Sequence, residues 1–328
     1  MHLHPAVLII GGLVIVILGA EFILRSSSYL AARLGISPMI IGLTIVSLGT
    51  SAPELAVGIA AVGEGRGGLA VGNIAGTNIV NILLILGLSA AIRALPLHLV
   101  SIRFDVPVMI GAALALFAMS WDGVLTPVEG GILLACGVLY TLGLIRINRR
   151  ESQVTQKEFS EEFSEQAQVK KYGKGVTALQ AVMLAGGITL TVLGAEVLVA
   201  GAVGAAAALG VSDAVIGLTI IAIGTSAPEL VTTMVSTIKN ERDVAIGNLI
   251  GSSILNIFVV LGITCMTAFE GGVALSRDVL LIDLPLAAAV AIACYPVFRS
   301  DRCVSRIEGT MFVSTYVLYV VTLIVFRT

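Results

Sequence analysis

The sequence predicts an all-helical integral membrane protein with ten transmembrane helices, arranged as two inverted-topology repeats of five. Hydrophobic residues make up 57% of the 328 residues and charged residues only 12%, whereas soluble domains contain about 25% charged residues. The mean hydropathy is +1.03. A soluble globule of this composition would have too few charged groups to cover its surface. These values exclude a cytosolic enzyme, a nucleic-acid-binding protein and a disordered chain.

Ten apolar runs approach the length of about 20 residues that a helix needs to cross a bilayer. They cover residues 6–24, 38–62, 68–91, 105–120, 127–145, 176–200, 213–237, 244–268, 280–297 and 307–326. The long polar stretch 146–175 separates five runs from five. We therefore expect one five-helix repeat at 1–145 and a second at 176–328, joined by a linker at 146–175.

The positions of Lys and Arg predict the orientation of these helices. With the N-terminus outside, sixteen of the 19 Lys and Arg residues fall in inner loops and three on the outer side. Short cytoplasmic loops carry this excess of positive charge in membrane proteins. We expect both termini outside and the central linker in the cytoplasm.

An internal repeat relates the two halves at an offset of 175 residues. Residues 42–56 and 217–231 are identical at 11 of 15 positions, and residues 71–90 and 246–265 at 8 of 20. The repeated motifs thus span 42–90 and 217–265. Because five is an odd number of spans, the second half must enter the membrane in the opposite direction. Inverted repeats are typical of secondary transporters, which bind their substrate near the midplane.

Two acidic residues occupy equivalent positions inside apolar spans. Glu54 lies in 38–62 and Glu229 in 213–237, and neither span contains Lys, Arg or His. A carboxylate at the bilayer centre costs about 2.5–3.5 kcal/mol. Two such groups at matched positions indicate a compensating cation. The alternative is that both are protonated and bonded to Asn or Ser.

Each glutamate follows a proline that should open its helix. Pro53 and Pro228 have no N–H, and their rings displace the carbonyl one turn earlier. The helix is therefore expected to open at 49–52 and 224–227, which frees backbone carbonyls such as those of Thr50 and Thr225. Unpaired backbone at this depth is tolerated only against protein or a polar cavity.

The third and eighth spans add polar residues at every fourth position. They are Asn73, Thr77 and Asn81 in one, and Asn248, Ser252 and Asn256 in the other. We expect Asn73 and Asn248 to form helix–helix hydrogen bonds. The whole set offers oxygen ligands and neither imidazole nor thiolate, which favours a hard cation such as Ca²⁺. Na⁺ or protons could use the same oxygens.

These motifs resemble those of the calcium/cation antiporter superfamily, specifically its sodium/calcium exchanger branch. The resemblance covers the whole chain and is carried by GTSAPEL at 49–55 and 224–230, and by GNxxG at 72–76 and 247–251. It implies a secondary antiporter that exchanges Ca²⁺ for Na⁺ by alternating access, with the first and sixth spans sliding across the rest. The linker is too short to contain a regulatory domain. A short linker of this kind is typical of a prokaryotic protein, and we expect the chain in the cell (inner) membrane.

The resemblance also implies the ligand set. Glu54 and Glu229 would be the central ligands, assisted by the carbonyls of Thr50 and Thr225. The sodium sites would be lined by Ser51, Ser226, Thr77 and Ser252, and the centre would be completed by Asn81 and Asn256. The best-known sodium/calcium exchangers carry Asp where this chain has Asn256, so the ion stoichiometry here does not follow from the resemblance.

Two other functions remain open at this point. One is a Ca²⁺/H⁺ antiporter of the same fold, and the other is a cation channel. An enzyme is not expected, because no HExxH, GxSxG or P-loop pattern occurs. We expect no cofactor, no nucleic acid and no obligatory protein partner, but a lipid bilayer and the transported ions Ca²⁺ and Na⁺ (or H⁺).

Four further acidic residues lie outside the central motifs. Glu21 and Glu196 are related by the repeat, and they could lie at the interface or on an ion pathway. Glu21 stands four residues before Arg25, the spacing of an ion pair on one helix face. Asp105 and Asp283 come two residues before a proline, so we expect them to cap helices.

Overall fold

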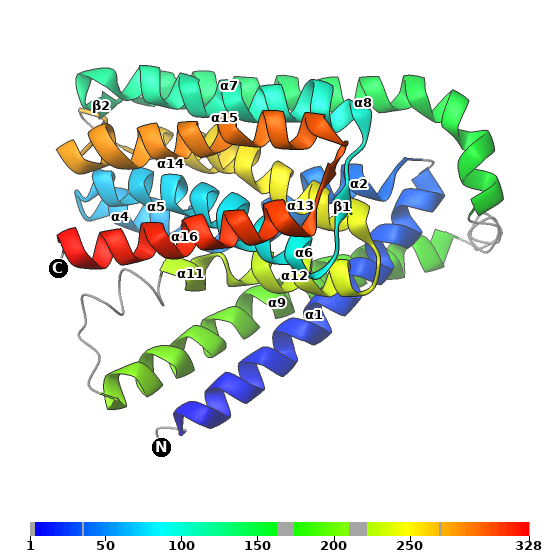
Figure 1. Ribbon diagram of the computed structural model, residues 1–328, viewed down its shortest axis with the longest axis horizontal. Coiled ribbons are helices and arrows are strands. Elements are labelled where there is room, and N and C mark those ends of the chain that lie inside the picture. Colours follow the sequence, from blue (N-terminus) through cyan, green and yellow to red (C-terminus); the bar gives the residue numbers. More distant parts are fainter. Residues whose placement is uncertain (1–3, 35, 163–173, 210–221, 269–270, 328) are drawn as a thin grey trace.

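The computed structural model describes residues 4–34, 36–162, 174–209, 222–268 and 271–327, and most of them are helical (Figure 1). Seven helices within this part are long and apolar enough to cross a membrane. They run over Pro5–Leu34, Gly67–Ile92, Ser101–Asp122, Pro127–Ile147, Gly175–Ala206, Arg242–Met266 and Val279–Ser300. The pair Pro38–Thr50 and Ala52–Gly63 passes the same test together, with a bend of 42° between its members. The chain is therefore an all-helical membrane protein.

The first half contains helices, short π-helical (η) segments and two very short strands. In chain order they are α1 (Pro5–Leu34), α2 (Pro38–Ile41), η1 (Gly42–Val46), α3 (Ser47–Thr50), α4 (Ala52–Gly63), α5 (Gly67–Ile79), η2 (Val80–Leu86), α6 (Gly87–Ile92), β1 (Leu95–Pro96), η3 (Ser101–Asp105), α7 (Val106–Met119), the 3₁₀ turn η4 (Ser120–Asp122), β2 (Val124–Leu125) and α8 (Pro127–Glu162).

The described elements of the second half follow a similar order. Its elements are α9 (Lys174–Ala208), α11 (Ala222–Thr225), α12 (Ala227–Ile238), α13 (Arg242–Leu255), η7 (Asn256–Leu261), α14 (Gly262–Met266), β3 (Val273–Ala274), η8 (Val279–Asp283), α15 (Leu284–Ser300), β4 (Cys303–Val304) and α16 (Arg306–Arg327). Residues 213–221, the start of one expected span, lie outside the described residues. The expected linker begins as helix, because α8 continues past residue 145 to Glu162.

The two halves meet at two small antiparallel strand pairs. In the first, β1 pairs with β4, and Leu95 lies opposite Val304. In the second, β2 pairs with β3, and Leu125 lies opposite Val273. Each pair takes one strand from each half, and the two registers are equivalent when the halves are exchanged.

Matching N-terminal caps follow these strands. Thr126 and Glu129 form a capping box at the start of α8, in which the Thr126 N–H and hydroxyl donate to Glu129 Oε2 at 2.7 and 2.8 Å. Ser305 and Glu308 repeat it at the start of α16, with both distances 2.8 Å. The Glu129 and Glu308 N–H groups donate back to the Thr126 and Ser305 hydroxyls at 3.2 and 3.3 Å, and this reciprocal bonding satisfies backbone groups that a helix start leaves unpaired.

The centre of the molecule is formed by two helical rods, α5–η2–α6 and α13–η7–α14. In the most apolar 18-residue stretch of each rod, 78% and 83% of the residues are buried. The corresponding share is 28–39% in the other five apolar helices. Figure 1 shows α1 and α9 side by side at one edge of the bundle, and α7 and α8 at the opposite edge. The rods are therefore surrounded by protein, whereas the outer helices expose apolar faces such as those of Ile10, Val14 and Leu139.

Asp105 and Asp283 do not cap helices through their side chains, contrary to expectation. Each helix instead begins earlier, because the residues before the proline form the π-helical segments η3 and η8, which run directly into α7 and α15. Asp105 is instead fully buried and accepts a hydrogen bond of 3.1 Å from the Tyr140 hydroxyl.

Candidate functional site

Two helix breaks determine where the central glutamates lie. Ser51 separates α3 from α4 with φ −83° and ψ 13°, and Ser226 separates α11 from α12 with φ −87° and ψ 9°. In each case a proline at the second position of the next helix provides no N–H for the preceding turn. Both breaks fall where the sequence predicts them. Each puts a glutamate in the first turn of the following helix and leaves Thr50 or Thr225 as the last residue before the break.

Glu54 and Glu229 are buried in the same region. Both are 0% exposed, and they are close enough to interact electrostatically. The Ser51 hydroxyl donates to Glu229 Oε1 at 3.0 Å, which links the first break to the carboxylate of the second half. Carboxyl groups from the two halves therefore meet in one water-excluded place.

Side chains of the two central rods add amide and hydroxyl groups to this region. Asn81 lies in η2 and Asn256 begins η7, and both are 0% exposed. Thr77 and Ser252 stand one turn earlier in α5 and α13, exposed by 2% and 0%. The π-helical turns occur at equivalent places in both halves, and such turns are frequent at functional sites.

Many polar atoms of these residues have no hydrogen-bond partner within the described part of the chain. They are both carboxylate oxygens of Glu54, Oε2 of Glu229, both amide atoms of Asn81 and Asn256, and the hydroxyls of Thr77, Ser226 and Ser252. Buried polar atoms in folded proteins are nearly always hydrogen-bonded, because an unpaired one loses its bonds to water. A concentration of unpaired oxygens around two carboxyl groups is what a desolvated cation would satisfy.

The donor chemistry of this region fits a hard cation. No group of three or more His, Cys, Asp or Glu side chains that could hold a metal ion occurs in the described ranges, so the additional ligands here would be hydroxyl, amide and carbonyl oxygens. Ca²⁺ accepts such oxygens in flexible arrangements of 6–8.

Asn248 connects three helices, as expected of a helix–helix hydrogen-bonding residue, whereas the Nδ2 of Asn73, for which the same was expected, has no hydrogen-bond partner among the described residues. Asn248 Oδ1 accepts from the Thr50 hydroxyl at 3.3 Å, and Asn248 Nδ2 donates to Thr233 Oγ1 at 3.3 Å. The Ser47 hydroxyl donates to the Asn248 carbonyl at 3.0 Å. These contacts orient Thr50 beside the break.

One set of polar residues next to the centre was not predicted from the sequence. Thr232, Thr233, Ser236 and Thr237 are all fully buried on α12. Their signal was present in the sequence, because they follow Glu229 at the spacing of one helix face.

Glu21 and Glu196 lie apart from the central residues. Glu21 forms an ion pair with Arg25 at 2.6 Å, the spacing predicted for one helix face, and a second one with Lys239 at the end of α12. Glu196 is exposed. The first therefore ties α1 to α12, and the second faces the surroundings.

A half-buried carboxyl group follows α12. Burial raises the pKa of Glu241 above its ordinary value of 4.5, and the neighbouring Asp243 carboxylate raises this pKa further. The Asp243 carboxylate lies 2.9 Å from His98 Nε2.

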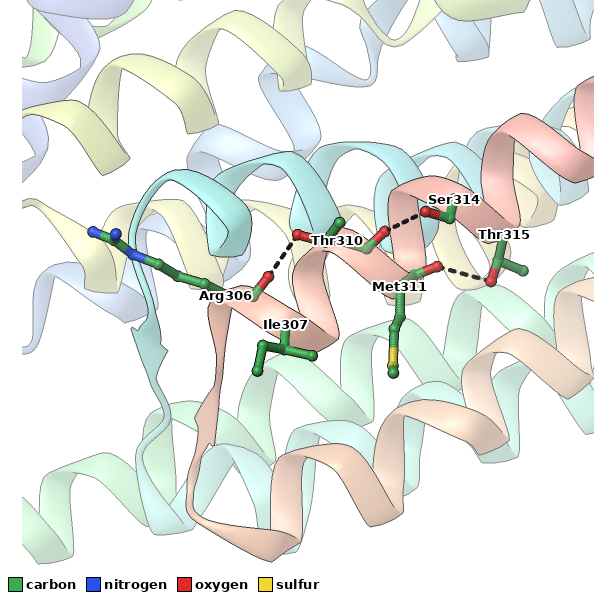
Figure 2. Close-up of a pocket in the computed structure, with 6 residues that line it drawn as sticks. All are labelled: Arg306, Ile307, Thr310, Met311, Ser314 and Thr315. Carbon is green, nitrogen blue, oxygen red and sulfur yellow. Dashed lines mark hydrogen bonds between the residues drawn. The ribbon is translucent and has the colours of Figure 1, made fainter.

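A groove of about 670 Å³ on the outer face of α16 differs from the central region (Figure 2). Its hydroxyls bond to their own helix, since Thr310 donates to the Arg306 carbonyl at 2.8 Å and Ser314 to the Thr310 carbonyl at 2.9 Å. Exposed Ile307 and Met311 complete its lining. This groove contains no residue of the predicted ligand set.

Comparisons with known proteins agree with the fold and the motifs. The chain is 34% identical to the putative antiporter CaxA of Alkalimonas amylolytica over 97% of its own length and 98% of that protein. It is 38% identical to the inner membrane protein YrbG of Escherichia coli, over 81% of this chain and 80% of that protein. A solved structure of the sodium-calcium exchanger NCX_Mj superposes with a TM-score of 0.80 at 24% identity, over 97% of this chain and 98% of the other. Residues 4–146 and 179–325 both match one family, described as sodium/calcium exchanger protein, and the chain belongs to that family.

Proposed function

We propose that this chain is a secondary antiporter that exchanges Ca²⁺ for Na⁺ across a membrane by alternating access. The observation that carries the proposal is the meeting of Glu54 and Glu229 among buried oxygens without partners. Membership of the sodium/calcium exchanger family supports the choice of ions. The likeness to CaxA and to NCX_Mj, whose names describe an antiporter and a sodium-calcium exchanger, agrees with it.

Charge balance explains why one site would serve two kinds of ion. Two carboxylates neutralise one Ca²⁺, and the same oxygens could hold Na⁺ when Ca²⁺ has left. In this proposal Glu54 and Glu229 bind Ca²⁺ together with the carbonyls of Thr50 and Thr225. The hydroxyls of Ser51, Ser226, Thr77 and Ser252 line sodium positions, and Asn81 and Asn256 complete the centre. An empty site would leave two like charges in a low-dielectric region, so occupation by one ion or the other precedes any rearrangement.

The proposed topology has ten spans in two inverted repeats, 1–145 and 176–328. The capping boxes and helix breaks support it, because each occurs once in each half, and the two strand pairs, which join the halves, have equivalent registers when the halves are exchanged. The Lys and Arg distribution supports outside termini and a cytoplasmic connection between the halves. The likeness to YrbG, whose name describes an inner membrane protein, supports an inner-membrane position for this chain.

Alternating access requires that the centre be sealed at some stage from both sides. Zero exposure of both glutamates corresponds to such a sealed state. The α1–α9 pair is a suitable moving element, because the two helices lie against each other along their length and expose most of their remaining surface. Their contact is close: a Cβ on Gly19 would lie 2.7 Å from the Gly187 carbonyl oxygen.

The decisive experiment varies the Na⁺, K⁺ and H⁺ gradients independently in proteoliposomes while Ca²⁺ flux is followed. Ca²⁺ movement driven by an opposing Na⁺ gradient is expected. Ca²⁺ movement that follows a pH gradient and ignores Na⁺ would instead assign a Ca²⁺/H⁺ antiporter. A steady Ca²⁺ current without any counter-ion would assign a channel.

A further inference from the structure

A stripe of buried hydroxyls leads away from Glu229 along α12. It consists of Thr232, Thr233, Ser236 and Thr237, which follow the glutamate at i+3, i+4, i+7 and i+8 on one helix face. All four are 0% exposed. At 1.5 Å per residue the stripe reaches about 12 Å from the glutamate, close to the end of the helix.

Thr233 Oγ1 accepts from Asn248 Nδ2 at 3.3 Å, whereas the oxygens of the other three hydroxyls remain available as acceptors. Ser236 Oγ donates to the Thr232 carbonyl at 2.6 Å, and Thr237 Oγ1 donates to the Thr233 carbonyl at 2.8 Å. A hydroxyl whose proton is used in this way keeps free lone pairs. The Thr232 hydroxyl has no hydrogen-bond partner among the described residues. Such a row suits a cation that has lost part of its water, because hydroxyl oxygens can replace water oxygens as ligands.

The first half of the chain does not repeat the stripe. The residues 175 positions earlier on α4 are Val57, Gly58, Ala61 and Val62. The packing also differs, since a Cβ on Gly58 would lie 2.7 Å from Thr264 Oγ1 of α14. A feature needed by the shared fold would occur in both halves. Its presence in one half therefore indicates a role on one side of the membrane.

Acidic groups lie where the stripe ends. The Glu241 N–H donates to the Ser236 carbonyl at 2.9 Å, so the half-buried Glu241 follows the stripe directly, and Asp243 lies beside it. The nearby Lys239 is engaged in its ion pair with α1. The position equivalent to Glu241 in the first half is Arg66. Basic side chains occur at both helix ends, because Arg242 follows Glu241 and Arg66 is ion-paired with Glu64, so the difference between the two halves rests on the hydroxyl stripe.

We propose that the α12 hydroxyl stripe is an access lane that stabilises partly dehydrated cations between the central site and the membrane face where α12 ends. In the topology above this is the cytoplasmic face. The inference rests on the proposed function, because it requires that cations pass through the centre. The route along α4 lacks equivalent ligands, so exchange should depend on side-chain hydroxyls at one face more than at the other.

The test is the double variant Thr232→Val/Ser236→Ala, which removes two hydroxyls at nearly constant shape. Ca²⁺ exchange is measured in inside-out and right-side-out membrane vesicles. We expect the half-saturating Ca²⁺ concentration at the face where α12 ends to rise about fivefold to tenfold, since each lost hydroxyl removes one ligand of hydrogen-bond strength. The value at the opposite face and Ca²⁺ binding to the detergent-solubilised protein should stay within twofold of wild type. Thr232→Ser, which keeps the hydroxyl, should behave as wild type.

The matched control is Thr310→Val/Ser314→Ala on α16. It makes the same chemical changes on the outer groove of Figure 2, where both hydroxyls donate to the carbonyl four residues earlier, as Ser236 does on α12. Unchanged kinetics are expected for this control. If the α12 variant also leaves both faces unchanged, or alters both faces equally, the lane does not exist. Loss of transport in Glu54→Gln would in those cases still support the central site, so the two proposals fail separately.

Discussion

Replacing Glu54 by Gln removes one of the two charges of the proposed site at constant shape. The Glu54 carboxylate is 0% exposed and has no hydrogen-bond partner in the described part of the chain, so the transported ion is its expected partner. Two unit charges 4 Å apart interact by about 4 kcal/mol at an effective dielectric constant of 20. Even if only one of the two ionic charges is counted, the loss corresponds to about a thousandfold weaker Ca²⁺ binding.

The same substitution should affect the ion-free protein in the opposite direction. Glu54 and Glu229 repel each other when both are charged and no cation is bound. Glu54→Gln should therefore raise the melting temperature in detergent with a chelator, while the stabilisation of wild type by added Ca²⁺ disappears. A variant that loses transport but gains stability has not lost its fold.

The assay is Na⁺-driven Ca²⁺ uptake into proteoliposomes, paired with melting curves with and without Ca²⁺. Glu64→Gln is the matched control, because this residue follows the same helix and its side chain is 63% exposed. It should leave transport and the Ca²⁺-dependent stabilisation unchanged. Uptake by Glu54→Gln with wild-type rate and Ca²⁺ dependence would refute the assignment of the central ligands.

Three further outcomes are expected. Asn256→Asp adds a third carboxyl group to the centre and should change the charge moved per cycle, measured as the reversal potential of exchange; an identical reversal potential would remove Asn256 from the charge balance. Tyr140→Phe takes away the donor to buried Asp105 and should destabilise the protein by about 1–3 kcal/mol in denaturant titrations, with Ca²⁺ affinity unchanged; unaltered stability would mean that this hydrogen bond contributes nothing. The raised pKa of Glu241 means that the folded protein holds its proton more tightly than the unfolded chain does, so the associated stability is present below pH 4.5 and is lost as the pH rises through the folded-state pKa. Glu241→Gln should therefore gain stability relative to wild type as the pH increases from 4.5, and parallel melting profiles would contradict this.

The helix breaks were predictable because their cause is local. Pro53 and Pro228 cannot donate to the preceding turn, and the structure interrupts both helices within two residues of each proline. The family was likewise predictable from the repeated motifs, and the all-helical membrane fold from the apolar composition. The proposed ligand set remains a prediction, although most of its members lie buried and unpaired in one region.

Other features depend on contacts between distant segments and could not be read from local patterns. Asp105 has the sequence context of a helix cap, but a π-helical turn extends the helix N-terminally of it. The Tyr140 hydroxyl donates a hydrogen bond to the Asp105 carboxyl group. The strand pairs contain two residues per strand, too few for a periodic signal. The α12 stripe was visible as a spacing, but Thr and Ser in an apolar helix have meaning only when burial is known.

The strand pairs have a consequence for the origin of the chain. Each strand pair joins a strand of one half to a strand of the other. Exchanging the halves converts the pair Leu95 opposite Val304 into the pair Val273 opposite Leu125. An isolated half would therefore leave two short strands without neighbours. It could satisfy both by binding a second copy of itself inserted in the reverse direction. If one gene encoded such a half and its product inserted in both orientations, two copies would already form the complete transporter. Fusion of two copies of that gene would then fix one half in each orientation within a single polypeptide.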